Sequence, residues 1–134
     1  MAFAVLVSLV LHILILFSFY YPANFISMPL TAGMIFSWLY SSSIIKDISA
    51  TQKDFSFKSL LSQLHPVIKY TLMLLGLYVV INFINTFSAH TGDNWVDFDL
   101  DYNKLRGISG FWLLFYALGL SSSYLKVRWH KKDH

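Results

Sequence analysis

The chain has 134 residues, of which 56% are hydrophobic and only 13% are charged. A soluble globular domain carries roughly twice that share of charge, so the composition favours a single integral membrane domain over residues 1–134. Cysteine is absent, which excludes disulfides and thiolate metal sites. The net charge of +3 does not indicate nucleic-acid binding, because the basic residues lie near the ends of apolar segments and not along one solvated face.

Four apolar segments are long enough for membrane-spanning helices, which need roughly 20 residues each. They cover residues 2–21, 25–45, 67–87 and 108–125. The first segment lacks the basic start and the cleavage site of a signal peptide, so we expect it to be retained. A turn around Pro22 makes the first two helices antiparallel neighbours. The predicted fold is an all-α integral membrane protein, with four transmembrane helices in a compact antiparallel bundle.

The connection between the second and third segments, residues 46–66, contains a short amphipathic stretch. Its apolar residues recur with the spacing of one helical face: Phe57, Leu60, Leu61 and Leu64. This pattern predicts a short interfacial helix, which either binds lipid through its leucines or docks on a partner protein.

Basic residues are distributed unevenly between the loops. Residues 88–107 carry only Lys104 and Arg106 beside four aspartates, whereas the other eight basic residues fall in the connector, at the start of the third segment and in the tail. The positive-inside rule therefore predicts a bacterial inner-membrane protein with cytoplasmic termini and a periplasmic loop at 88–107. Cations of the tail, residues 126–134, are expected to contact anionic lipid headgroups at the cytoplasmic face: Lys126, Arg128, Lys131 and Lys132.

Each apolar segment carries small or polar residues at helical spacing. Because polar groups are costly in hydrocarbon, these stripes predict the faces that the helices turn toward one another. The stripes are Ala4, Ser8 and His12; Pro29, Gly33, Ser37 and Ser41; Thr71, Tyr78, Asn82 and Asn85; and Ser109, Trp112, Tyr116, Gly119 and Ser123.

His12 lies near the middle of the first segment and forms a candidate intramembrane polar site with Ser8. The simplest interpretation is a neutral imidazole that is hydrogen-bonded to Ser8 or to a neighbouring helix. Proton relay is the alternative, although no other ionisable side chain lies deep in a predicted span. Haem ligation would require a second histidine at the same depth, and His130 with His134 would form only a weak metal site. We therefore expect no cofactor.

A second candidate cluster lies where the third segment ends and the fourth begins. It contains Asn82, Asn85, Arg106 and Ser109. Such a cluster either ties two helix ends together or binds a ligand or partner.

The glycines that flank Ser109 raise the question of a reactive serine. Gly107-Ile108-Ser109-Gly110 is one residue short of G-x-S-x-G, and no strand precedes it. A triad with His90 would lack a scaffold, so we expect no enzymatic activity. The preferred interpretation is a loop-to-helix transition at the outer surface, with Arg106 at the headgroups and Trp112 as an interface anchor. Ser109 then either caps the helix or bonds across to the third segment.

Three motifs together carry a resemblance. They are L-x-x-L-H-P-V-I-K-Y, ending at Tyr70; Y-V-V-I-N-F, residues 78–83; and L-R-G-I-S-G-F-W-L-L-F-Y, residues 105–116. Their combination resembles an uncharacterised family of small bacterial four-span membrane proteins with R-G-x-S-G-x-W-x-x-F-Y at the start of the last helix. The resemblance implies the same topology and a bacterial origin, but no activity. This chain has Phe111 where that family often has a histidine.

These features predict a non-catalytic accessory or interaction subunit, whose partner is another membrane protein or a second copy of the chain. An immunity-type protein that binds a membrane-active toxin is one version of this function. The alternatives are an oligomeric transporter, channel or proton-linked subunit that uses His12, and a redox or quinone-associated subunit. A water-accessible path to His12 would favour transport, whereas a sealed His12 would argue against transport through the monomer.

Overall fold

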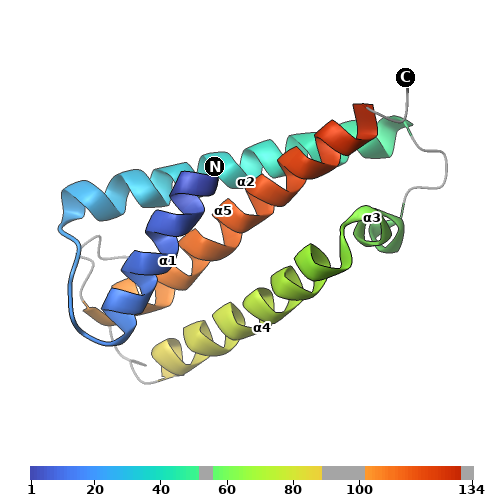
Figure 1. Ribbon diagram of the computed structural model, residues 1–134. Helices are drawn as coiled ribbons and strands as arrows, with labels where there is room; N and C mark the ends of the chain where they lie inside the picture. Colours follow the sequence, from blue (N-terminus) through green and yellow to red (C-terminus); the bar gives the residue numbers. More distant parts are fainter. Residues whose placement is uncertain (52–55, 89–101, 131–134) are drawn as a thin grey trace.

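The computed structural model describes residues 1–51, 56–88 and 102–130. This part of the chain is all-helical, as predicted, and contains five helices (Figure 1). They are α1 (Ala2–Leu16), α2 (Asn24–Thr51), α3 (Phe57–Gln63), α4 (Pro66–Ser88) and α5 (Tyr102–His130). By length and apolar composition, two stretches of the described helices are able to cross a membrane: Pro66–Thr86 in α4 and Lys104–Trp129 in α5.

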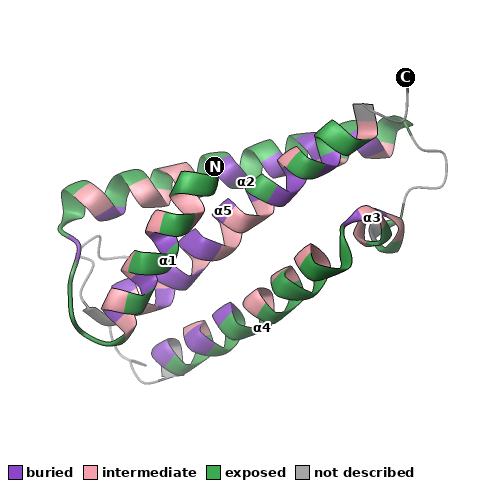
Figure 2. Ribbon diagram, viewed as in Figure 1, coloured by how far each residue is buried: buried purple, intermediate pink, exposed green. Residues whose placement is uncertain are grey.

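α5 is the central helix of the bundle, because α1, α2 and α4 each pack against it. α1 and α4 run in one direction, and α2 and α5 run in the other (Figure 1). Half of the apolar stretch of α5 is buried, against only 11% of that of α4. α4 therefore displays most of its apolar surface, whereas a core helix of a soluble protein would be mostly covered (Figure 2).

α1 ends earlier than the predicted span of residues 2–21. Ser18 takes a left-handed conformation, with a φ of 59°. The backbone N–H of Phe19 then donates to the carbonyl of Leu14 at 2.9 Å, which closes the helix in a Schellman motif. With 15 residues, α1 is about 22 Å long, shorter than the roughly 30 Å of a hydrocarbon core. Met1, the residue before its first turn, lies beside Ser37, halfway along α2, with 3.5 Å between Sδ and Oγ.

α2 and α5 are both longer than the sequence pattern predicts. α2 continues to Thr51 instead of ending at residue 45, and α5 begins at Tyr102 instead of residue 108. The glycines at 107 and 110 are therefore inside a helix, and the predicted loop-to-helix transition with Ser109 as its cap is wrong. Trp112 is fully buried, so its interpretation as an interface anchor is wrong as well.

α3 is present as predicted, but its apolar face contacts protein. Ser56 caps the helix by accepting a hydrogen bond from the backbone N–H of Ser59 at 3.1 Å. Leu60 and Leu64 are buried in a cluster with residues of α2 and α5, so the expectation that these leucines bind lipid is wrong. α3 thus closes one end of the bundle, which we call the basic end. The basic residues described there are Lys46, Lys58, Lys69, Lys126 and Arg128.

The bundle is polar inside and apolar outside. Within the described residues, buried polar or charged side chains are as numerous as buried hydrophobic ones. Large apolar side chains, in contrast, cover the outer faces of α1, α2 and α4; examples are Phe3, Phe36, Leu74 and Leu77, which are 79%, 71%, 68% and 61% exposed. This distribution is the reverse of that of a soluble protein and suits surroundings of lipid.

Two glycines of the bundle give a matched test of helix packing. A Cβ atom at Gly33 would overlap the hydroxyl of Tyr116, whereas one at Gly110 would make an ordinary contact of 3.4 Å with Val79. We expect Gly33→Ala to lower the free energy of unfolding by about 1–3 kcal/mol. Gly110→Ala should leave it unchanged or raise it by about 0.5–1 kcal/mol, since alanine favours helix over glycine. Unfolding of the purified protein in detergent, followed by tryptophan fluorescence, measures both effects. Equal effects of the two substitutions would contradict the packing described here.

Candidate functional site

His12 of α1 is hydrogen-bonded to side chains of two other helices. It is 3% exposed and lies one turn before the end of α1, not at the middle of a longer span. Its Nδ1 atom is 2.8 Å from Ser109 Oγ on α5, and its Nε2 atom is 2.7 Å from Tyr78 Oη on α4. One imidazole therefore joins α1, α4 and α5.

The hydrogen bonds around Ser109 determine where the protons lie. Ser109 Oγ donates to the carbonyl of Arg106 at 3.2 Å, so it is left to accept from His12. In a neutral imidazole one nitrogen donates and the other accepts. The assignment that satisfies every contact therefore has the proton on Nδ1, and Nε2 accepts from the hydroxyl of Tyr78. The result is a one-way chain of hydrogen bonds from Tyr78 through His12 and Ser109 to the Arg106 carbonyl.

The Arg106 carbonyl also joins the second candidate cluster to the first. Asn82 Nδ2 donates to this oxygen at 2.9 Å, and the carbonyl of Asn82 accepts from Thr86 Oγ1 at 2.8 Å. The two sites that the sequence suggests separately are thus one group, which we call the polar centre. It consists of His12, Tyr78, Asn82, Ser109 and the carbonyl of Arg106.

Two residues named from the sequence lie outside the polar centre. Asn85 is exposed, whereas Asn82, three residues earlier, is buried. Ser8 is fully buried on the same face of α1 as His12, but its hydroxyl has no hydrogen-bond partner among the described residues. Of the two partners expected for the imidazole, Ser8 or a neighbouring helix, the second is confirmed, because α4 and α5 supply both of its hydrogen bonds.

The pair of Ser109 and His12 has the separation of a nucleophile and its base. However, Ser109 is 0% exposed, and the third member is the phenol of Tyr78 instead of a carboxylate. No three residues of the types His, Cys, Asp or Glu gather at a possible metal site within the described ranges. The arrangement is therefore suited to tying helices together. His90, the loop aspartates, Lys131, Lys132 and His134 lie outside the described residues.

A second set of hydrogen bonds ties α2 to α5. Trp112 Nε1 donates to Thr31 Oγ1 at 3.0 Å, and Thr31 Oγ1 donates to the carbonyl of Ser27 at 2.9 Å. Tyr116 Oη donates to the carbonyl of Leu30 at 2.9 Å, directly above Gly33. Sequence analysis missed Thr31 as a partner. Thr31 follows Ser27 by four residues, so the two share a helical face beside the stripe that begins at Pro29.

The other residues singled out from the sequence pack against neighbouring side chains or lie at the basic end. Phe111, where the resembled family often has a histidine, packs edge-to-face on Phe83, with ring centroids 5.3 Å apart. Lys126 and Arg128 are exposed at the basic end. Arg128 Nη1 donates to the carbonyl of Gln63 at 2.7 Å, which fastens the end of α5 to α3.

Comparison of the chain with protein-family models, with curated proteins and with solved structures finds no match. The resemblance to small bacterial four-span proteins therefore stays a prediction.

Two substitutions on one face of α1 test whether the polar centre stabilises the bundle. We expect His12→Ala to lower the free energy of unfolding in detergent by about 1–3 kcal/mol, because it removes the hydrogen-bond partners of Ser109 and Tyr78. Ser8→Ala, one turn away, removes a buried hydroxyl without a partner, so it should be neutral or stabilising. If Ser8→Ala destabilised the protein as much as His12→Ala, the loss would reflect general packing and not the hydrogen bonds.

Proposed function

We propose that this chain is a multi-pass protein of the bacterial inner membrane, with α1, α2, α4 and α5 crossing the bilayer and both termini facing the cytoplasm. The alternating helix directions and the basic residues at one end of the bundle support this orientation (Figure 1). The exposed apolar faces of α1 and α2 support two crossings beyond those of α4 and α5. The α1 crossing is the shortest, since the helix begins beside Ser37.

Within that membrane, the proposed function is a non-catalytic accessory or interaction subunit, which acts through contacts between helices. The burial of His12 and Ser109 carries this proposal, with their partner Tyr78 at the margin of the group and 38% exposed. His12 is 3% exposed and Ser109 is 0% exposed, and both nitrogens of the imidazole are already hydrogen-bonded. A substrate has no access to this serine, and a histidine sealed in this way does not suit transport through the monomer. The exposed apolar side chains on one face of α2, Ile35, Phe36 and Leu39, offer a surface for a partner helix.

The proposed topology is tested by labelling single cysteines, which is direct because the natural chain has none. Cysteine at Ala23, between α1 and α2, or at Asp97 in the outer loop should react with a membrane-impermeant maleimide added to whole cells. Cysteine at Lys131 in the tail should react only after the cells are opened. The reverse pattern would overturn the orientation, and protection of Ala23→Cys alone would remove the α1 crossing.

The proposed subunit role is tested by purification in a mild detergent from the native host. We expect a second membrane protein to co-purify in a fixed ratio and to be missing when the same tagged chain is made in an unrelated host. A parallel proton-flux assay on vesicles containing the chain alone should show no flux. A flux that His12→Ala abolishes would contradict the proposal and favour a proton-linked transporter.

A further inference from the structure

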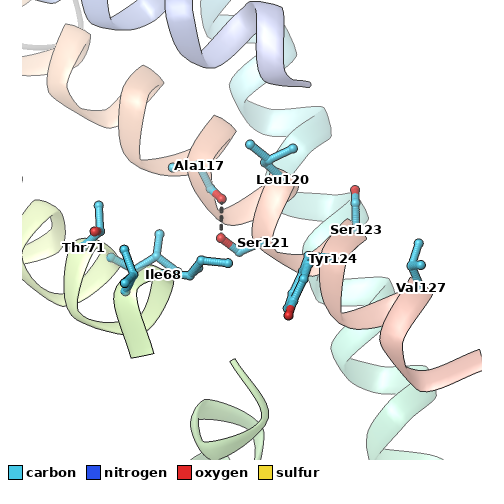
Figure 3. Close-up of a pocket in the computed structure, with 10 residues that line it drawn as sticks. Ile68, Thr71, Ala117, Leu120, Ser121, Ser123, Tyr124 and Val127 are labelled. Atoms are coloured by element: carbon cyan, nitrogen blue, oxygen red, sulfur yellow. Dashed lines mark hydrogen bonds between the residues drawn. The ribbon is translucent and has the colours of Figure 1, made fainter. Parts of the chain in front are cut away.

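An open groove lies between the first turns of α4 and the last turns of α5, near the basic end (Figure 3). Its volume is about 530 Å³, within the range of about 300–1,000 Å³ that is common for ligand sites. Ile68 and Leu72 form the wall on α4, and Ala117, Leu120, Tyr124 and Val127 form much of the wall on α5. Ile68 and Leu72 also pack against the buried cluster of α2, α3 and α5. The groove therefore has a closed floor and opens toward the surroundings of the bundle.

Two of the four hydroxyl groups that line the groove, those of Ser121 and Ser123, donate to backbone carbonyls. Ser121 Oγ donates to the carbonyl of Ala117 at 2.8 Å (Figure 3), and Ser123 Oγ donates to that of Gly119 at 3.0 Å. Since these donors are satisfied within α5, the wall offers an occupant mainly apolar surface. A polar ligand would lose its hydration without gaining hydrogen bonds, whereas a hydrocarbon chain would gain close packing.

A cation lies in line with the groove at its basic end. Arg128 follows Ser121 and Tyr124 at intervals of seven and four residues, so it continues the groove face of α5 by one turn. Arg128 is exposed, and its guanidinium donates to the Gln63 carbonyl at 2.7 Å, which holds it between α5 and α3. That bond occupies one of its five donors, so the others are available to a phosphate.

We propose that this groove binds one acyl chain of an anionic phospholipid, whose headgroup phosphate is bound by Arg128. An acyl chain suits the groove better than a second copy of the chain, because a helix with its side chains is about 10–12 Å wide and cannot enter between two contacting helices. The inference rests on the membrane location proposed above. The cysteine labelling tests that location by itself, so a correctly inserted chain that binds no lipid would disprove only the present inference.

Native mass spectrometry of the purified protein in a neutral detergent tests this site. The probes are phosphatidylglycerol and phosphatidylcholine with the same acyl chains. Both lipids carry a phosphate, but that of phosphatidylcholine is already neutralised by its own choline cation. We therefore expect the wild-type chain to bind phosphatidylglycerol about tenfold more tightly, because a hydrogen-bonded charge pair is worth about one order of magnitude or more in affinity. Arg128→Gln should reduce this binding to the level of phosphatidylcholine. Lys126→Gln, which removes a nearby cation on another face of α5, should leave the preference intact.

Filling the groove provides the second arm of the experiment. Ala117→Phe and, from the exposed rim, Thr71→Phe should each lower the binding of both lipids at least tenfold. Leu77→Phe, on the exposed outer face of α4, is the control and should have no effect. Equal binding of the two lipids by the wild type would overturn the role of Arg128. Unchanged binding in both filled variants, or a dimer that these variants dissociate, would overturn the acyl-chain site.

Discussion

Three helices of this protein meet at one imidazole ring. His12 accepts a hydrogen bond from Tyr78 and donates one to Ser109, so α1 is fastened to α4 and α5 at a single level. In lipid the hydrophobic effect does not hold helices together, because acyl chains are as apolar as leucine side chains. Association then depends on close packing and on hydrogen bonds between helices. The short α1, with its apolar outer face, has His12 as its hydrogen-bonded attachment to both neighbours.

α5 supplies further hydrogen bonds between helices. Its buried face carries Ser109, Trp112 and Tyr116, each of which bonds to a residue on another helix. Gly33 on α2 leaves room for one of these side chains, because a Cβ atom there would overlap the hydroxyl of Tyr116. The central position of α5 thus follows from its sequence, which places small and hydrogen-bonding residues on a face that is otherwise apolar.

The sequence predicts the inward faces well where a single helical period decides them. Ser8 and His12, Ser37 and Ser41, and Trp112 with Tyr116 are buried as their spacing indicates. The stripe on α4 is only partly right, because Thr71 and Asn85 are exposed while Val79 and Thr86 are buried. An error in a predicted helix boundary also leads to errors in the predicted positions of nearby side chains. The glycines near Ser109 favour a loop, which makes Trp112 an interface anchor, whereas its stripe alone indicates the buried position that the structure has.

The helical spacing of polar residues does not predict which partner each polar group has. His12 and Ser109 are 97 residues apart, and Trp112 and Thr31 are 81 apart, so a pattern shows that each needs a partner but not which one it has. The leucines of α3 illustrate the same limit, since an amphipathic face looks alike whether lipid or protein covers it.

The distance between α4 and α5 differs between the two ends of the bundle. α4 is held close to α5 at the end opposite the basic end, where Asn82 bonds to the Arg106 carbonyl and Gly107 faces Thr86. From there the two helices diverge toward the basic end (Figure 1). The leucines of α3 fill the space on one side of the divergence, and the groove remains on the other. In the membrane location that we propose, a gap with apolar walls does not stay empty, because acyl chains gain dispersion contacts by entering it. The glycines that allow close contact at the polar centre thus also lead to the lipid site that we propose at the opposite end.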